Sequence, residues 1–132
     1  MQSIILALTV LVSLVLSGPV TAQSVRPVFS QAIPNVPGKS LITVEVTYAP
    51  GEKSNPHRHA RSAFIHGYVI SGTIRTQVEG KPVQTLKAGE SFYELPGDHH
   101  ILGENASQIE PASFLAVFVV DTDDKVLTTP DK

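Results

Sequence analysis

The chain has 132 residues, with 10 lysine and arginine residues against 12 aspartate and glutamate residues, and a formal net charge of -2. This length supports a single domain, and the near-neutral charge balance offers no broad basic field for nucleic acid. Because the chain contains no cysteine, disulfides, thiolate nucleophiles and cysteine-ligated metal sites are excluded.

The first 22 residues have the pattern of a secretory signal peptide. Ile4 to Leu16 are nearly all apolar, and no charged side chain precedes Arg26. Gly18-Pro19 follows, and then Val20-Thr21-Ala22, which has small residues at the positions that a signal peptidase recognises. An apolar run of about 13 residues is shorter than the roughly 20 that cross a bilayer. We therefore predict cleavage after Ala22, export to the periplasm or outside the cell, a domain over residues 23–132, and no membrane contact after cleavage.

The rest of the chain is dominated by patterns typical of β-strands. Apolar and polar residues alternate in Leu41–Tyr48 and in Ile74–Glu79, which indicates strands with one buried face, and Val83–Lys87 is a plausible return strand. Phe64–Ile70 and Phe114–Val120 are more continuously apolar, so we expect strands buried on both faces. Turn signals fall at Pro50-Gly51, Ser71-Gly72, Gly80, Ala88-Gly89 and Pro96-Gly97. Such spacing favours an antiparallel sandwich or barrel.

The five histidines all lie between residues 57 and 100. His57 and His59 follow Pro56, which favours an extended backbone, and residues two apart on a strand point to the same side. Both imidazoles are then close enough to share a metal at about 2.0–2.1 Å. The alternative is a pair of surface histidines beside a turn. A third ligand would come from the adjacent His99 and His100, between which the spacing alone does not choose.

These residues resemble the two motifs of the cupin superfamily, and in particular of small single-domain bacterial cupins. The first motif matches Gly51, His57-Arg58-His59 and Gly72, and the second matches Gly89, Gly97 and His100. The resemblance covers about residues 41–120. It implies an all-β, double-stranded β-helix (jelly-roll) fold. It also implies glycines that shape turns, metal ligation by His57, His59 and His100, and a His99 that points away.

The chain departs from the first motif at one ligand position. Counting seven residues back from Gly72 gives Ile65, where the motif has a glutamate. His66 would enter the site only through a strand bulge. Glu94 precedes the turn that carries His100, so it is a candidate fourth ligand or proton acceptor; the alternative is a solvated strand charge. Tyr68 is a candidate cavity residue together with Tyr93, although core packing fits both equally well.

The leading functional hypothesis is a mononuclear centre for a divalent transition metal (Fe, Zn, Ni, Mn or Cu). The resemblance favours dioxygenase-like chemistry on a small molecule over hydrolysis, with Glu94 and Tyr68 as the candidate catalytic residues. The alternatives are a non-catalytic protein that binds a metal or small ligand, and a metal-free jelly roll. We also expect a homodimer, because the apolar stretches Val25–Ile33 and Phe114–Val120 offer surfaces to a second subunit.

Overall fold

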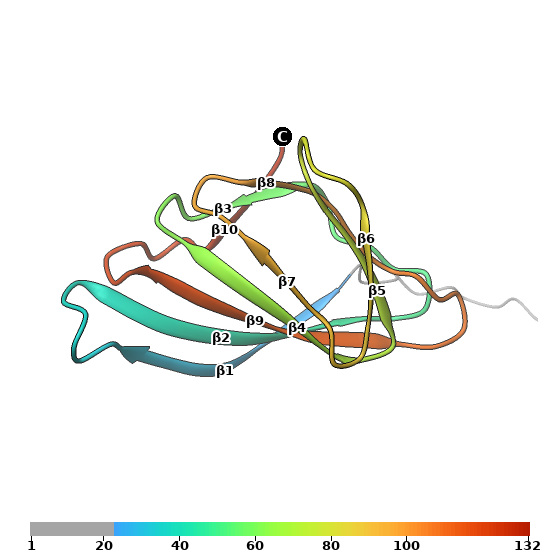
Figure 1. Cartoon of the computed structure of the whole chain (residues 1–132), viewed down its shortest axis with the longest axis horizontal. Helices are drawn as coiled ribbons and strands as arrows, with labels where there is room; N and C mark the ends of the chain where they lie inside the picture. Colours follow the sequence, from blue (N-terminus) through green and yellow to red (C-terminus); the bar gives the residue numbers. More distant parts are fainter. Residues whose placement is uncertain (1–22) are drawn as a thin grey trace, which may run out of the picture.

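The computed structural model describes residues 23–132, which form two five-stranded antiparallel sheets packed face to face (Figure 1). The first sheet has the order β1-β2-β9-β4-β7 and the second the order β10-β3-β8-β5-β6. The strands are β1 (Ser24–Ala32), β2 (Lys39–Tyr48), β3 (His57–His59), β4 (Phe64–Ser71), β5 (Thr73–Val78), β6 (Gln84–Lys87), β7 (Ser91–Glu94), β8 (His99–Asn105), β9 (Ala112–Asp121) and β10 (Thr128–Pro130). The predicted all-β, double-stranded β-helix fold is confirmed.

No segment of residues 23–132 is helical, so this part of the chain has no helix that could cross a membrane. The predicted signal peptide, residues 1–22, lies outside the described residues.

The alternating stretches form the strands that the sequence predicts. Leu41–Tyr48 lies within β2, where Val46 and Tyr48 are buried, and β5 buries Ile74 and Val78. β9 lies at the centre of its sheet and is buried or partly buried along most of its length.

The expectation that Phe64–Ile70 is buried on both faces is wrong. This segment lies in β4, in which Ile65 and Val69 are buried whereas Phe64, Tyr68 and Ile70 are exposed. The reason is that the second sheet covers only one face of β4, while the apolar residues on the opposite face have no covering layer among residues 23–132.

The core lies between the two sheets. It is made of apolar side chains from both: Val46, Tyr48, Ala63, Ile65, Val69, Ile74, Phe92, Ala112, Phe114, Ala116, Phe118 and Val120. Gly67 on β4 makes room for this packing, because a Cβ atom there would lie 2.2 Å from the Phe92 ring.

The motif glycines form turns, as expected. Gly51, Gly72, Gly89 and Gly97 all have positive φ angles. At Gly72, with φ of 71°, a Cβ atom would also lie 2.6 Å from the carbonyl oxygen of Pro111. Glycine is therefore required there both by the backbone conformation and by the close approach of another segment.

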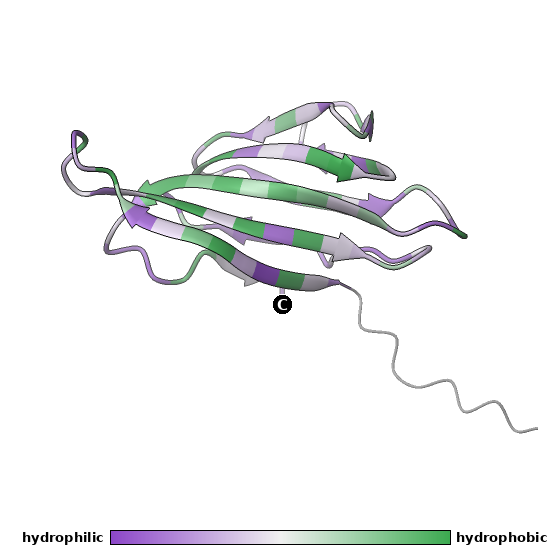
Figure 2. Ribbon diagram, turned by 90° about the horizontal axis from the view of Figure 1, so that it is seen from below, coloured by the Kyte–Doolittle hydropathy of each residue, from purple (hydrophilic) through white to green (hydrophobic). Residues whose placement is uncertain are grey.

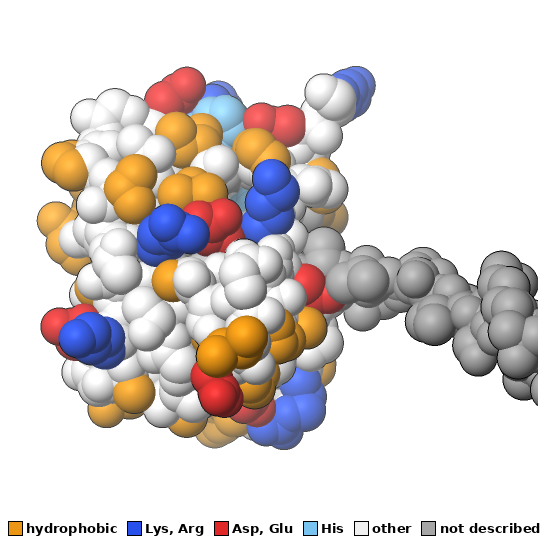
Figure 3. Space-filling view, turned by 90° about the vertical axis from the view of Figure 1, so that its right-hand side faces the viewer, with side chains coloured by type: hydrophobic (Ala, Val, Ile, Leu, Met, Phe, Trp, Pro, Cys, Tyr) orange, Lys and Arg blue, Asp and Glu red, His pale blue; other side chains and the backbone are white. Residues whose placement is uncertain are grey.

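The outer face of the first sheet exposes apolar residues, among them Phe64, Tyr68 and Tyr93. Figure 2 looks onto this sheet, and its central strand β9 is hydrophobic along most of its length. All nine residues of β1, the edge strand, are exposed. Figure 3 shows one end of the molecule, where lysine and arginine side chains are interspersed with acidic ones. This end presents no basic patch of the kind that binds nucleic acid.

Candidate metal centre

Three histidines from two strands that are distant in sequence meet on the inner side of the second sheet. β3 and β8 are antiparallel neighbours in which His57 pairs with His100 and Arg58 with His99. Since side chains alternate along a strand, His57, His59 and His100 face the interior. His57 is 8% exposed and His100 4%. The predicted trio is therefore brought together, and the register selects His100 over His99.

The three rings direct one nitrogen each towards a common centre. His57 Nε2 lies 3.2 Å from His59 Nε2 and 3.2 Å from His100 Nδ1. Two nitrogen ligands of one tetrahedral ion, each about 2.05 Å from it, are about 3.3 Å apart. These two separations match a single small cation between the rings, and the ligand atoms of all three residues lie within 4.8 Å of one another.

The second nitrogen of His57 and of His59 is bonded to the backbone. His57 Nδ1 lies 2.8 Å from the carbonyl oxygen of Asn55, and His59 Nδ1 lies 3.1 Å from that of Leu127. A carbonyl can only accept, so both Nδ1 atoms carry a proton and donate it. Each neutral ring then turns the lone pair of its Nε2 atom to the centre, as a metal-ligating histidine requires.

His100 is held in the same way by a side chain. Its Nε2 atom lies 2.8 Å from the hydroxyl oxygen of Thr76, a buried residue of β5. The hydroxyl can accept a hydrogen bond from Nε2, and in that tautomer the lone pair of His100 Nδ1 faces the other two rings. All three imidazoles are thus oriented by groups outside the centre.

Glu94 is the fourth polar group at the centre. It is 3% exposed, and its Oε2 atom lies 3.5 Å from His59 Nε2 and 3.7 Å from His100 Nδ1. Its other oxygen, Oε1, is buried without a hydrogen-bond partner among the described residues. Leaving a buried acceptor unpaired costs about 1–3 kcal/mol, and more when it is charged. The carboxylate and the three ring nitrogens together fit a cation that all of them can contact.

The electrostatics of the centre keep the ligand groups in the forms that bind metals. Burial lowers the pKa of His57 and of His100, which favours their neutral rings. For Glu94, burial acts to raise the pKa, but the three neighbouring imidazoles favour the charged carboxylate more strongly and lower the pKa. The carboxyl group is therefore ionised at neutral pH.

The centre opens into a cavity of about 70 Å³ between the two sheets. Apart from the histidines and Glu94, its walls are mainly apolar and include Phe92, Phe114 and Phe118. The exposed residues Val25 and Thr128 form its outer rim. A cavity of this size and lining admits a small molecule whose carbon atoms contact the apolar walls.

A family model described as the cupin domain matches residues 44–118. The chain belongs to the cupin family. No curated protein sequence matches it.

Several solved structures share its fold. The cupin domain of Schizosaccharomyces pombe Cnp3 has a TM-score of 0.62 and 15% identity, over 80% of this chain and 66% of that one. An oxalate oxidase in complex with the substrate analogue glycolate has a TM-score of 0.61 and 22% identity, over 84% and 56%. A Klebsiella pneumoniae protein with a double-stranded β-helix domain has a TM-score of 0.57 and 20% identity, over 81% and 85%. The matched region thus spans less than two thirds of the length of the first two.

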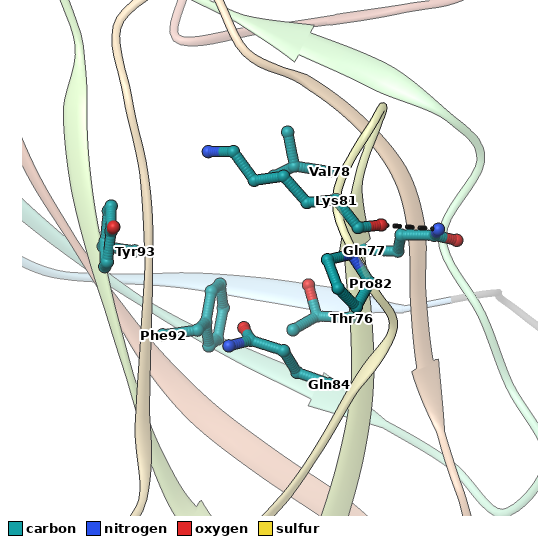
Figure 4. Close-up of a pocket in the computed structure, with 8 residues that line it drawn as sticks. All are labelled: Thr76, Gln77, Val78, Lys81, Pro82, Gln84, Phe92 and Tyr93. Atoms are coloured by element: carbon teal, nitrogen blue, oxygen red, sulfur yellow. Dashed lines mark hydrogen bonds between the residues drawn. The ribbon is translucent and has the colours of Figure 1, made fainter.

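A second pocket, of about 200 Å³, lies beside the centre of this cupin (Figure 4). It is bounded by the β5–β6 hairpin and β7, and Thr76 and Phe92 lie between it and the histidines. Figure 4 shows Phe92 pointing from β7 towards the hairpin and Tyr93 pointing to the other side of β7. Lys81 lies at its edge, 3.1 Å from Asp98 and 5.8 Å from the centre of the Tyr93 ring.

The expectation that Tyr68 and Tyr93 line the cavity is wrong, as is the alternative that they pack in the core. Tyr68 is 43% exposed and Tyr93 59% exposed. Both lie on the outer face of the first sheet, because Gly67 and Phe92, their neighbours on β4 and β7, take the inward positions. Tyr68 therefore does not line this cavity.

The two remaining histidines of the cupin point away from the centre. His66 is exposed and bonds Ser91 through its Nε2 atom at 3.0 Å, and β4 has no bulge at His66. His99 faces outward, 3.3 Å from Glu79 and 2.8 Å from Asp131.

Sequence reasoning missed the groups that orient the rings. The sequence did contain a signal for Thr76, because a polar residue at a buried position of an alternating strand needs a hydrogen-bond partner. The sequence contained no such signal for Leu127. This residue acts through its backbone carbonyl, and any residue at that position offers the same oxygen.

Proposed function

We propose that this cupin holds one divalent transition-metal ion with His57, His59 and His100 and acts on a small molecule as a dioxygenase-like oxidoreductase. The observation that carries the proposal is the convergence of three oriented ring nitrogens and a buried, unpartnered carboxylate oxygen in one apolar cavity. When bound, such an ion would supply Lewis acidity and open coordination positions for a substrate and dioxygen.

The cavity limits the substrate in size and charge. A volume of about 70 Å³ is well below the roughly 300–1,000 Å³ of pockets for drug-sized ligands. Among the described residues that line it there is no lysine or arginine. An anionic substrate would thus be held by the metal itself, and the apolar walls would contact its carbon atoms. The glycolate bound to the structurally similar oxalate oxidase is a molecule of this size.

We propose in addition that the protein is exported, with cleavage after Ala22. Gln23 would then be the first residue, and it lines the same cavity as the histidines. Removal of the leader would place a free chain end close to the entrance of the centre.

Oxygen uptake tests the catalytic proposal. Untagged protein would be reconstituted with Fe²⁺ and other divalent transition metals and assayed against thiols, diketones, phenols and short hydroxy acids. We expect uptake with at least one compound, and its loss in His57→Ala and His100→Ala. One metal per chain without turnover would support the alternative, non-catalytic metal or small-ligand binding. No bound metal after reconstitution would overturn both.

A further inference from the structure

Ile65 and Glu94 face each other across two neighbouring strands. The register of β4 and β7 pairs them directly, and both are buried and line the cavity of the histidines. Opposed residues of an antiparallel pair have Cβ atoms about 4.5–5.5 Å apart and point to the same side. A carboxylate on either strand therefore reaches the same part of the cavity.

The Glu94 carboxylate lacks partners that would explain its burial. Its Oε1 atom has none among the described residues, and its Oε2 atom is no closer than 3.5 Å to a ring nitrogen. Charge-assisted hydrogen bonds are about 2.7–2.9 Å long, so neither histidine makes one in this arrangement. A cation between the three rings would be a direct partner for this oxygen pair.

The backbone fixes this carboxylate relative to His100. The two residues flank a short turn that leads from β7 in one sheet to β8 in the other. In this turn, the backbone N–H of Leu95 donates to Asp98 Oδ2 at 2.8 Å, and that of Asp98 donates to the carbonyl oxygen of Leu95 at 3.0 Å. The turn therefore positions the carboxylate and the imidazole before any ligand binds.

We infer that Glu94, on β7, is the carboxylate ligand of this centre and takes the place of a ligand at position 65 on the opposite strand. The inference rests on the metal-holding function proposed above. Three neutral imidazoles and one carboxylate reduce the charge of a divalent ion to +1. They also make a mixed nitrogen and oxygen ligand set, which suits iron, zinc, nickel or manganese. For manganese, this mixed set is more suitable than a set of nitrogen ligands alone.

Cobalt(II) titration of the full chain tests the inference, because the visible spectrum of Co²⁺ reports its ligands as well as its affinity. For Glu94→Gln, which keeps the size of the side chain, we expect at least tenfold weaker binding and an altered absorption spectrum. Glu79→Gln, which changes an exposed glutamate, is the matched control and should leave both unchanged. Circular dichroism would establish that each variant is folded.

A strand exchange provides the second arm. In the double variant Ile65→Glu with Glu94→Ile, the carboxylate returns to position 65, and we expect Co²⁺ affinity to recover to within about tenfold of the wild type. Weaker binding in Glu94→Gln with an unchanged spectrum would reduce Glu94 to a nearby charge and overturn the inference. Unchanged binding would also overturn it, while the three-histidine proposal would stand. If wild-type protein bound no Co²⁺, both proposals would fail.

Discussion

Thr76 Oγ1 lies 2.8 Å from His100 Nε2, on the side of the ring that faces away from the other two histidines. This contact makes Thr76 a positioning residue, since it holds the His100 ring with Nδ1 turned to the other two histidines. Thr76→Val keeps the shape of the side chain but removes the hydroxyl. We expect metal affinity to fall about 10–100-fold, measured by competition with a chelator.

Two further variants separate this role from packing. Thr76→Ser retains the hydroxyl and should restore most of the affinity. Thr85→Val, at an exposed position of the neighbouring strand β6, should have no effect. Equal loss in the serine and valine variants would contradict the positioning role.

The stability of the metal-free protein should depend on pH through its buried histidines. The pKa values of His57 and His100 are lowered in the folded state, so the unfolded chain binds protons more readily than the folded one. Stability is then fully present above the ordinary histidine pKa of about 6.5 and falls as the pH drops below it. The pKa of Glu94 is also lowered, so its contribution is lost only at more acidic pH.

Thermal unfolding of chelator-treated protein at pH 7.5 and pH 5.5 measures this dependence. We expect a lower Tm at pH 5.5. His57→Gln combined with His100→Asn should weaken the dependence because neither replacement titrates. A Tm that does not change between the two pH values in the wild type would contradict the prediction.

We predict self-association through the outer face of the first sheet. On this face, paired residues of neighbouring strands form rows that cross all five strands. One such row consists of Phe29, Thr43, Val117, His66 and Tyr93. Phe29, Phe64 and Tyr93 are exposed, and the rings of Phe64 and Tyr93 lie 6.2 Å apart. An apolar face of this breadth is typical of a protein interface. The aromatic residues of β1, β4 and β7 contribute more to the expected interface than the stretch Phe114–Val120 that the sequence suggested. Half of that stretch faces the core.

Sedimentation velocity tests this prediction. Wild-type protein at tens of micromolar should sediment as a dimer, and Phe64→Lys combined with Tyr93→Lys should sediment as a monomer. Ile109→Lys, at a highly exposed position outside the sheets, is the control and should remain dimeric. A monomeric wild type would show that a second copy does not cover this face.

If the protein is exported, its mature form should have a defined N-terminus. Expression of the full chain in a bacterial host, followed by fractionation and mass spectrometry, should find the protein outside the cytoplasm with Gln23 as its first residue. Replacing Ala22 with a bulky residue should retain the leader, because the peptidase needs a small side chain there. Full-length protein in the cytoplasm would contradict the prediction.

Local patterns in the sequence predicted the strands and the placing of His57 and His59 on one face, because these depend on alternation along one segment. Ile42, Val44, Val46 and Tyr48 share one face whichever strand lies beside them. The same two-residue period places His57 and His59 together. The resemblance selected His100, and the β3–β8 register agrees with it.

Which groups of different strands meet was decided only by the tertiary structure. Glu94 reaches the centre because β7 pairs with β4 in a register that sets it opposite Ile65, and Thr76 meets His100 because β5 pairs with β8. Tyr68 faces outward although its strand is apolar, because a second layer covers only one side of the sheet. Alternation along a strand fixes which residues share a face, whereas the pairing of distant strands fixes what that face meets.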